Sequence, residues 1–435
     1  MGILRAGITN VDITPPIGAR LMGYGSRDHG AEGIHDPLHA QALVLDDGAT
    51  RVGIVGCDLC TIREEQTAHV REYAASLCDI DPSHIMLCCS HTHGGPSMTE
   101  RGTATGQKEN IETTLRKLGG AVACSANNLR EVKSGLGRGS VRMGMNRREL
   151  RDGKIVLGEN PNGTIDPEVT VLRIDTLGGR PLAAVFNYAC HGTTLGGDNY
   201  LITADYVGYA RQMIERRIRR RGVLSLFVNG CAGDINPRPP RRTFMACKDR
   251  GHEVGEEAAK VWHKIKTKPE ALLASKEATV RLPVAPPPTL AELKAMERDA
   301  AKQWRAAKQA NACSDWRRMP LDWAREMIRR RTKGGLKRSI PVGLHAVRIG
   351  DLGIVGMPGE VLVEIGLQIK ARSKFPHTIP AAYANGRQGY IPTKKAIAEG
   401  GYETTSHIWR REQPYSPSTE KALVTGAARL LNSLA

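Results

Sequence analysis

Residues 85–96 read Ile85-Met-Leu-Cys-Cys-Ser-His-Thr-His-Gly-Gly-Pro96, a short apolar run followed at once by a polar, glycine-rich cluster. An apolar run of this length, bounded by turn residues, is typical of a buried strand. The arrangement recurs where Leu182–Tyr188 precedes Cys190–Thr193 and where Val223–Val228 precedes Asn229–Asp234. Ligands in open α/β sheets bind beyond the carboxyl ends of the strands. The sequence therefore predicts a ligand site at these strand ends.

Outward from these runs, strands and helices alternate. Residues 4–16 read as an extended segment that stops at Pro15-Pro16. The apolar runs 42–45 and 51–56 flank an Asp46-Asp-Gly48 turn, which favours a hairpin. Helices are predicted over 63–77, 109–130 and 206–221. This alternation predicts an α/β fold with mixed sheets flanked by helices.

The stretch Pro283-Val-Ala-Pro-Pro-Pro288 interrupts the alternation, because proline stops both helices and central strands. After it we predict two helices rich in Lys, Arg and Ala, then two strands and a helix. Their ranges are 290–310 and 320–331 for the first two helices, 342–349 and 352–355 for the strands, and 359–373 for the last helix. We therefore expect one domain over 1–435, with a basic helical hairpin inserted at 289–339.

Composition and charge limit the classes of function. Of the 435 residues, 40% are apolar and 25% charged, as in globular proteins, while 4% are aromatic, too few for a base-stacking surface. The net charge is +17, and residues 289–339 hold fourteen Lys and Arg against six Asp and Glu. Such a block can attract anionic substrates, although a solvated helical face is the simpler interpretation. No nucleic-acid-reading motif accompanies it, so we expect no nucleic-acid partner.

The ten cysteines lie mostly in apolar runs, which suits buried, reduced thiols. The lone Cys57-Asp-Leu-Cys60 pair is interpreted as structural, because no second pair follows at zinc-ribbon spacing. No apolar run reaches membrane-spanning length, and no signal-peptide pattern opens the chain. We expect a cytoplasmic protein and leave its oligomeric state open, with a homo-oligomer as one alternative.

The strand-end clusters contain side chains that bind metals. His91 and His93 lie two residues apart, so on an extended segment both project to the same side. One can ligate a metal while the other faces the same cavity, and His191 offers a third imidazole. The alternatives are loop histidines held by hydrogen bonds, or a core histidine. Asp234 can hold a metal, orient a histidine or simply cap backbone amides.

Catalytic zinc usually takes three protein ligands and keeps a position for water, so two histidines are not enough. Several later residues could complete the set, and the pattern does not choose among them: Glu360, His377, Tyr390, Tyr402 and His407. Four earlier residues could form an additional metal site or orient the ligands through hydrogen bonds: His35, Asp36, His39 and Asp58.

A series of short motifs, each weak alone, covers essentially the whole chain in a fixed order. They are Ala6–Pro16, Leu21-Met-Gly-Tyr24, Gly33–Ala42, Ser90–Pro96, Asn146-Arg147, His191-Gly-Thr193, Asp205, Gly233–Arg238, Pro358-Gly-Glu360, Gly389–Thr393 and Tyr402-Glu403. Together they resemble the neutral/alkaline non-lysosomal ceramidase family of zinc amidases. The resemblance is to the catalytic domain of that family, without its C-terminal immunoglobulin-like domain.

The resemblance implies a Zn²⁺ ion held by His91, His191, Glu360 and Tyr390. It also implies that His93 and Arg147 face the substrate carbonyl and that Tyr402 lines the same site. Zinc lowers the pKa of its water to about 7, which provides a nucleophile for a small-molecule amide or a lipid-like N-acyl substrate. The alternatives are a zinc esterase or lactonase on the same site, and an inactive binding protein of the same fold.

Two departures from the family pattern matter. The serine of the family motif G-D-V-S-P is Asn236 here, which excludes a serine nucleophile at that position. The basic segment 289–339 has no matching counterpart. A smaller or more polar amide is therefore an alternative to ceramide, and a basic insert near the site would favour anionic substrates.

Overall fold

The computed structural model describes residues 2–99, 106–218, 222–238, 242–309 and 315–435. Its larger sheet has eight strands in the order β12-β10-β9-β6-β1-β3-β4-β5. Their bounds are β1 Arg5–Asp12, β3 His39–Asp46, β4 Arg51–Cys57, β5 Ile85–Cys89, β6 Arg130–Ser140, β9 Glu168–Thr176, β10 Pro181–Tyr188 and β12 Leu224–Asn229. The pairs β10–β12 and β4–β5 are parallel and the others antiparallel, which confirms the expected mixed sheet in an α/β fold.

A four-stranded sheet stacks on the larger one, in the order β14-β15-β16-β18. Its strands are β14 Leu273–Pro283, β15 Ser339–Ile349, β16 Leu352–Gly356 and β18 His377–Ala381. Alternation along β5 shows how the core divides: Met86 and Cys88 join the cluster between the sheets, whereas Leu87 and Cys89 face the other side. Burial on both faces explains why this strand reads as a continuous apolar run.

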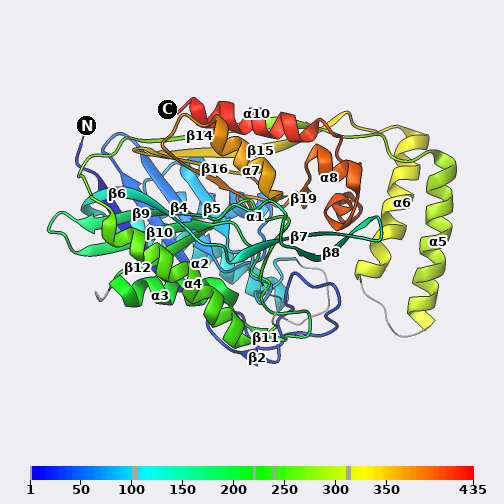
Figure 1. Cartoon of the computed structure of the whole chain (residues 1–435), viewed down its shortest axis with the longest axis horizontal. Coiled ribbons are helices and arrows are strands. Elements are labelled where there is room, and N and C mark those ends of the chain that lie inside the picture. Colours follow the sequence, from blue (N-terminus) through cyan, green and yellow to red (C-terminus); the bar gives the residue numbers. More distant parts are fainter. Residues whose placement is uncertain (1, 100–105, 219–221, 239–241, 310–314) are drawn as a thin grey trace.

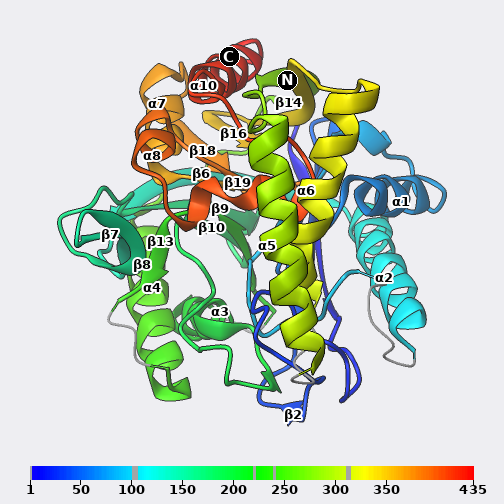
Figure 2. The same cartoon turned by 90° about the vertical axis from the view of Figure 1, so that its right-hand side faces the viewer.

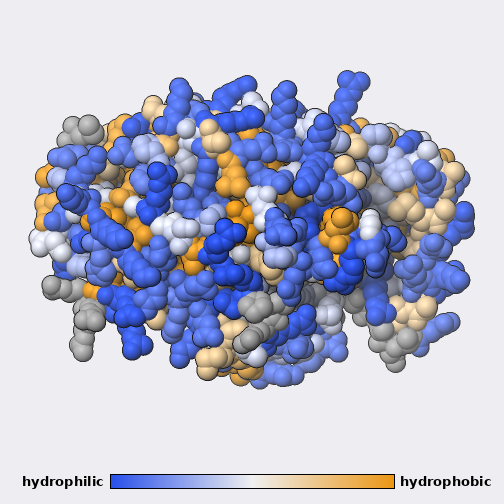
Figure 3. Space-filling model, in the orientation of Figure 1, coloured by the Kyte–Doolittle hydropathy of each residue, from blue (hydrophilic) through white to orange (hydrophobic). Residues whose placement is uncertain are grey.

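Helices cover the outer faces of both sheets (Figure 1). On the larger sheet lie α2 (Gln107–Asn127), α3 (Asp205–Ile218) and α4 (Phe244–Lys264), with α1 (Glu64–Ala75) beside α2. On the smaller sheet lie α7 (Val363–Arg372) and α10 (Thr419–Asn432). None of the helices in the described ranges is long and apolar enough to cross a membrane. The face seen in Figure 3 is mainly hydrophilic.

The other elements of the α/β body are short. They are β2 Gly33–Ile34, β7 Gly144–Arg151, β8 Lys154–Asn160, β11 Leu201–Ile202, β13 Ile235–Pro237, β17 Glu360–Val361, β19 Tyr390–Ile391, α8 Lys394–Glu399, α9 Ser406–Arg410 and the 3₁₀ turns η1 Pro82–His84 and η2 Tyr402–Thr404. None of these elements was predicted, and the two- and three-residue strands among them carry too little periodicity to detect.

Two elements have bounds that differ from the predicted ones, each for a physical reason. The first strand ends at Asp12 rather than at Pro15, because the Asp12 carboxylate accepts the Thr14 N–H and turns the chain. The predicted helix 359–373 is wrong at its start: Glu360 and Val361 form β17 against β19, and α7 begins only at Val363. Glu360 is therefore presented by a strand.

The basic segment forms a helical hairpin of α5 (Leu290–Gln309) and α6 (Asp315–Lys333), which connects β14 to β15 (Figure 2). Helix α6 begins before the predicted residue 320 and includes Pro320. Residue 310 of the predicted first helix, and residues 219–221 of the helix predicted at 206–221, lie outside the described ranges. The hairpin is attached to the α/β body where the Trp323 indole N–H donates to the Glu412 carbonyl (2.8 Å) and Arg330 pairs with the Glu412 carboxylate (2.8 Å).

Candidate active site

Three of the predicted clusters meet where β5, β10 and β12 end. The Asn229 amide donates to the backbone oxygens of Ser90 (2.9 Å) and Cys190 (3.2 Å), so one side chain joins all three strand ends. Thr92 and Gly192 then bridge as parallel partners. Gly192 is required for this approach, because a Cβ there would lie 2.9 Å from the His91 carbonyl oxygen. The two histidine clusters are thus held side by side.

His91 is buried and has its backbone in the left-handed region, with φ 64°. Its Nδ1–H donates to the Cys60 carbonyl (2.6 Å), which leaves Nε2 directed inward, 3.2 Å from Oε2 of Glu360. The Tyr383 ring stacks on the imidazole at 4.1 Å. Burial alone would lower the pKa of His91, but Cys60 and Glu360 raise it to about 10. The His91 imidazole is therefore protonated at Nε2 at neutral pH, and a metal ion bound there would have to displace this proton.

His191 repeats this arrangement from β10. Its Nδ1–H donates to the Ala232 carbonyl (2.6 Å), and its Nε2 lies 3.2 Å from the same Glu360 oxygen. Burial lowers the pKa of His191 to about 3, so Nε2 carries a lone pair. Burial also opposes ionisation of Glu360, but the charge of His91 and the close contact with both imidazoles hold the pKa of its carboxyl well below the ordinary value. Two acceptors that face each other at this distance call for a cation between them.

Tyr390 lies beside Glu360 because β17 and β19 pair in parallel with these two residues in register. The Tyr390 hydroxyl accepts a hydrogen bond from Arg147 (2.9 Å). Burial raises the pKa of the phenol well above its ordinary value, and the Arg147 charge opposes this. The β17–β19 pair thus presents a carboxylate and a phenol oxygen at the same place.

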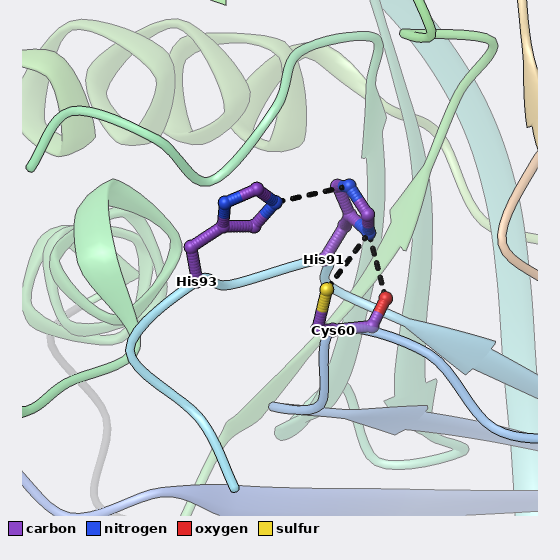
Figure 4. A group of neighbouring side chains, drawn as sticks. All are labelled: Cys60, His91 and His93. Atoms are coloured by element: carbon purple, nitrogen blue, oxygen red, sulfur yellow. Dashed lines mark hydrogen bonds between the residues drawn. The ribbon is translucent and has the colours of Figure 1, made fainter. Parts of the chain in front are cut away.

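The donor set fits a zinc ion. Ligand atoms of His91, His191 and Glu360 lie within 4.8 Å of one another, and both imidazoles are fixed through Nδ1 by backbone carbonyls, as is typical of metal-ligating histidines. A second group meets the same distance limit, namely Cys60, His91 and His93. Figure 4 shows why it fits less well. The Cys60 sulfur approaches Nδ1 of His91 (3.6 Å), which is already occupied, while His93 approaches Nε2 on the opposite edge (3.3 Å).

Arg147 connects the donor set to its surroundings. Its Nε donates to Glu403 (2.9 Å), one terminal nitrogen donates to Asn236 (3.1 Å) and approaches His191 Nε2 (3.4 Å), and the other donates to Tyr390. Burial would lower the pKa of the guanidinium, but Tyr390 and Glu403 raise it well above the ordinary value. A permanent, oriented positive charge therefore lies next to the phenol and the imidazoles.

A cavity of about 920 Å³ opens onto this cluster. His93, Arg147, Asn236, Tyr390 and Tyr402 line it. The Tyr402 ring packs against Tyr390 at 5.4 Å, and burial lowers the pKa of His93 well below its ordinary value. All seven residues that the resemblance singled out therefore lie together, and their roles stay predictions.

The other sequence candidates lie elsewhere or act structurally. Asp234 accepts from the Val363 backbone (2.9 Å) and from the Asn146 amide (2.9 Å), as the capping interpretation predicted, and burial raises its pKa to about 6. His377 begins β18 beside Leu352, at the far end of that sheet. His407 packs against Trp323 of the insert, at 5.2 Å.

The four early residues form no metal-ligand group within the described ranges. Asp58 pairs with Arg211, and His39 bonds to the Asn10 amide (3.2 Å). The Asp36 carboxylate accepts a hydrogen bond from the Thr203 hydroxyl (2.5 Å). The backbone oxygen of Thr203 accepts a second one from the hydroxyl of Thr92, which stands between His91 and His93 in the sequence (2.8 Å). Asp36 therefore supports the loop that carries His91 and His93 indirectly, through Thr203.

Sequence reasoning assigned no role at the site to three residues that surround His91 and His93, although Tyr24 stands in one of the quoted motifs. Tyr383 stacks on His91 with a positive φ of 57°, and Tyr24 packs edge-on against His93 at 4.8 Å. Cys60 was interpreted only as a structural cysteine, yet its carbonyl fixes the His91 tautomer. A backbone acceptor leaves no mark on residue type, so no sequence signal could have found this last role.

A family model described as neutral/alkaline non-lysosomal ceramidase, N-terminal, matches residues 4–268. The chain belongs to this family. A neutral ceramidase of Pseudomonas aeruginosa is 24% identical over 484 residues, a match that covers 96% of this chain and 70% of the relative. Neutral ceramidase B of Dictyostelium discoideum is 26% identical over 253 residues, which are 53% of this chain and 34% of that protein. This chain thus spans about a third of the length of that ceramidase.

The fold is also that of solved ceramidase structures. The crystal structure of neutral ceramidase from Pseudomonas aeruginosa superposes with a TM-score of 0.74 at 22% identity, over 100% of this chain and 75% of that one. A ceramidase complexed with C2 superposes with a TM-score of 0.75 at 20% identity, over the same shares of the two chains. The family model confirms the predicted family resemblance, and the two superpositions confirm the predicted fold class.

Proposed function

We propose that this protein is a zinc-dependent amidohydrolase that cleaves a carboxamide. One observation carries the proposal: the Nε2 atoms of His91 and His191 both lie 3.2 Å from a single carboxylate oxygen of Glu360, with Tyr390 in register beside it. His91, His191, Glu360 and Tyr390 would hold the zinc ion. When bound, zinc supplies Lewis acidity, which acidifies a water for attack on an amide carbonyl.

The chain's own residues then bind and stabilise the substrate. Arg147 is fixed at three points by Glu403, Asn236 and Tyr390, so its guanidinium is preorganised to meet negative charge that develops on the carbonyl oxygen. His93 lines the cavity with its ring 3.3 Å from His91 and can hydrogen-bond to the same carbonyl. Hydrolysis adds the hydroxide of a water molecule to the acyl carbon and its proton to the departing amine. Tyr402 lines the cavity beside Tyr390, so it can contact the bound substrate.

The substrate is an N-acyl amide or a related small carboxamide. The relatives are named as ceramidases, which supports amide chemistry, and the cavity of about 920 Å³ has room for a medium-sized ligand. Asn236 takes the position of the family serine and accepts from Arg147. It therefore holds the guanidinium and cannot serve as a nucleophile.

The test is metal content and activity of the purified protein, wild type beside His191→Ala. We expect about one zinc per chain in the wild type and loss of both zinc and amide hydrolysis in the variant. His377→Ala is the control, because it removes a histidine far from the site. Matched amide and ester substrates, ceramide included, separate an amidase from an esterase or lactonase. No zinc after reconstitution, or zinc without turnover of any amide, would refute the proposal.

A further inference from the structure

The two helices of the basic insert differ in how their charges are matched. Five arginines of α6 have nearby acceptors, which are Asp322 for Arg318, Glu297 for Arg325, Glu326 for Arg329 and Arg330, and the carbonyls of Pro287 and Pro288 for Arg331. On α5, by contrast, four cations have no ion pair or hydrogen bond within the described part of the chain, namely Lys294, Arg298, Lys302 and Arg305. The insert therefore carries a set of unmatched positive charges on α5.

These four cations, called the α5 stripe, lie along one face of the helix. A helix advances 100° and 1.5 Å per residue, so the stripe occupies about 80° of the circumference and extends over about 16 Å. All four side chains are exposed. The buried residues of α5, which are Leu293, Ala300 and Ala307, lie on the roughly opposite face, and α5 packs against α6. Because α5 forms the outer edge of the molecule, with α6 between it and the α/β body (Figure 1), the stripe faces outward.

The α5 stripe is not compensated by its own helix. Neighbouring members of the stripe stand three or four residues apart, the spacing at which like charges repel each other on a helix surface. Of the three carboxylates of α5, Glu297 pairs with Arg325 of α6 and Glu292 accepts from Thr289, which leaves Asp299. A helix that keeps four repelling cations on its outer face is complementary to an anionic surface outside the chain.

A lipid surface fits the stripe better than a nucleic acid does. Clusters of four or more Lys and Arg on an amphipathic helix bind the headgroups of anionic lipids, and a straight stripe at the outer edge of the molecule can meet a flat surface along its whole length. A nucleic acid would also be held through base stacking or groove contacts, and the sequence carries no motif for either. The same hairpin lies beside the active-site cavity, because Arg317 of α6 is one of the residues that line it.

We propose that the α5 stripe docks the protein on membranes rich in anionic lipids, with the insert as the contacting element. The docked hairpin would lie next to the cavity that an amide carried in the membrane has to enter. This inference goes beyond the proposed hydrolysis and can be tested without any turnover.

Co-sedimentation of the full chain with lipid vesicles tests the docking directly. One set of vesicles contains phosphatidylcholine alone, and the other contains equal amounts of phosphatidylcholine and phosphatidylglycerol. We expect binding to the anionic vesicles and none to the neutral ones. Binding should weaken by at least about tenfold between about 0.1 M and about 1 M salt, because the Debye length falls from about 10 Å to about 3 Å.

A stripe variant connects the binding to α5. It combines Lys294→Gln, Arg298→Gln, Lys302→Gln and Arg305→Gln, and glutamine keeps the helix propensity of the residues it replaces. We expect its partition onto anionic vesicles to fall by at least about thirtyfold. Circular dichroism of the variant should show an unchanged helix content.

The matched control removes the same amount of charge from the α/β body. It combines Lys108→Gln, Arg130→Gln, Lys264→Gln and Lys276→Gln, which are exposed positions on α2, β6, α4 and β14. Since the two variants have the same net charge, the control separates a docking surface from a general effect of the basic chain. Its partition onto anionic vesicles should stay within about threefold of wild type.

The outcomes separate the docking from the proposed amidase. Equal binding of wild type to neutral and anionic vesicles, or an equal loss in the stripe variant and the control, would overturn the docking. Stripe-dependent binding to a mixed-sequence DNA duplex without vesicle binding would overturn it in favour of a nucleic-acid partner. Stripe-dependent vesicle binding without hydrolysis of any amide leaves the docking standing and removes the amidase, whereas hydrolysis of a water-soluble amide without vesicle binding does the reverse.

Discussion

Arg147→Lys tests whether an oriented guanidinium, rather than a positive charge alone, is what the site needs. Arg147 reaches Glu403, Asn236 and Tyr390 at 2.9, 3.1 and 2.9 Å from three different nitrogens. The single lysine nitrogen cannot reach three acceptors in this planar arrangement. Loss of one preorganised donor to a developing oxyanion costs about a hundred- to thousandfold in kcat, or about 2.7–4 kcal/mol. We therefore expect kcat for the best amide substrate to fall by that factor.

Arg148→Lys is the matched control. Arg148 is equally buried and pairs with the other oxygen of Glu403 (2.7 Å), but it turns toward Gly400 (2.8 Å) and away from the cavity. Both variants should lose similar stability in urea unfolding, because each weakens one half of the same buried ion-pair group. Zinc content, kcat and KM are measured for both. A kcat of Arg147→Lys within threefold of wild type, or an equal fall in Arg148→Lys, would refute the reasoning.

Three further expectations concern separate parts of the molecule. Tyr390→Phe should lower both zinc retention and kcat, because it removes the oxygen that accepts from Arg147; an unchanged rate in kinetic assays would exclude a role for the phenol. Burial lowers the pKa of His345 from 6.5 to about 3, so the folded protein holds this imidazole in its neutral form. The contribution of His345 to the free energy of unfolding is therefore complete above pH 6.5 and is lost as the pH falls from 6.5 toward 3. Between pH 7 and pH 5 the wild-type free energy of unfolding, measured by urea titration, should therefore drop by about 2 kcal/mol more than that of His345→Gln, and parallel curves would contradict this. Trp323→Ala should cost about 3 kcal/mol of local packing and expose the insert to limited proteolysis while the α/β body stays intact, and an unchanged cleavage pattern would count against it.

Local patterns predicted much of the α/β body. The run at 85–89 is β5 to the residue, and the hairpin and the helices near 63–77 and 109–130 lie within a few residues of their predicted bounds. Such runs are visible because burial on both faces makes a strand continuously apolar. The start of α7 was mispredicted because Leu362 is helix-compatible in type. The pairing of β17 with β19 and the hydrogen bond from the Leu362 N–H to the Ile391 carbonyl hold this segment extended.

The sequence by itself determined the chemistry available: imidazoles placed directly after buried strands, a glycine-rich turn beside them, and a series of motifs in family order. The residue pattern left open which later residue completes the donor set, since Glu360, His377, Tyr390, Tyr402 and His407 are equally compatible with it, and only the family resemblance implied Glu360 and Tyr390. Tertiary structure brings Glu360 to the two imidazoles, because that geometry depends on distances between residues a hundred or more positions apart. Those distances are set by the parallel pairing of β17 with β19 and by the packing of the strand ends, neither of which any local sequence pattern encodes.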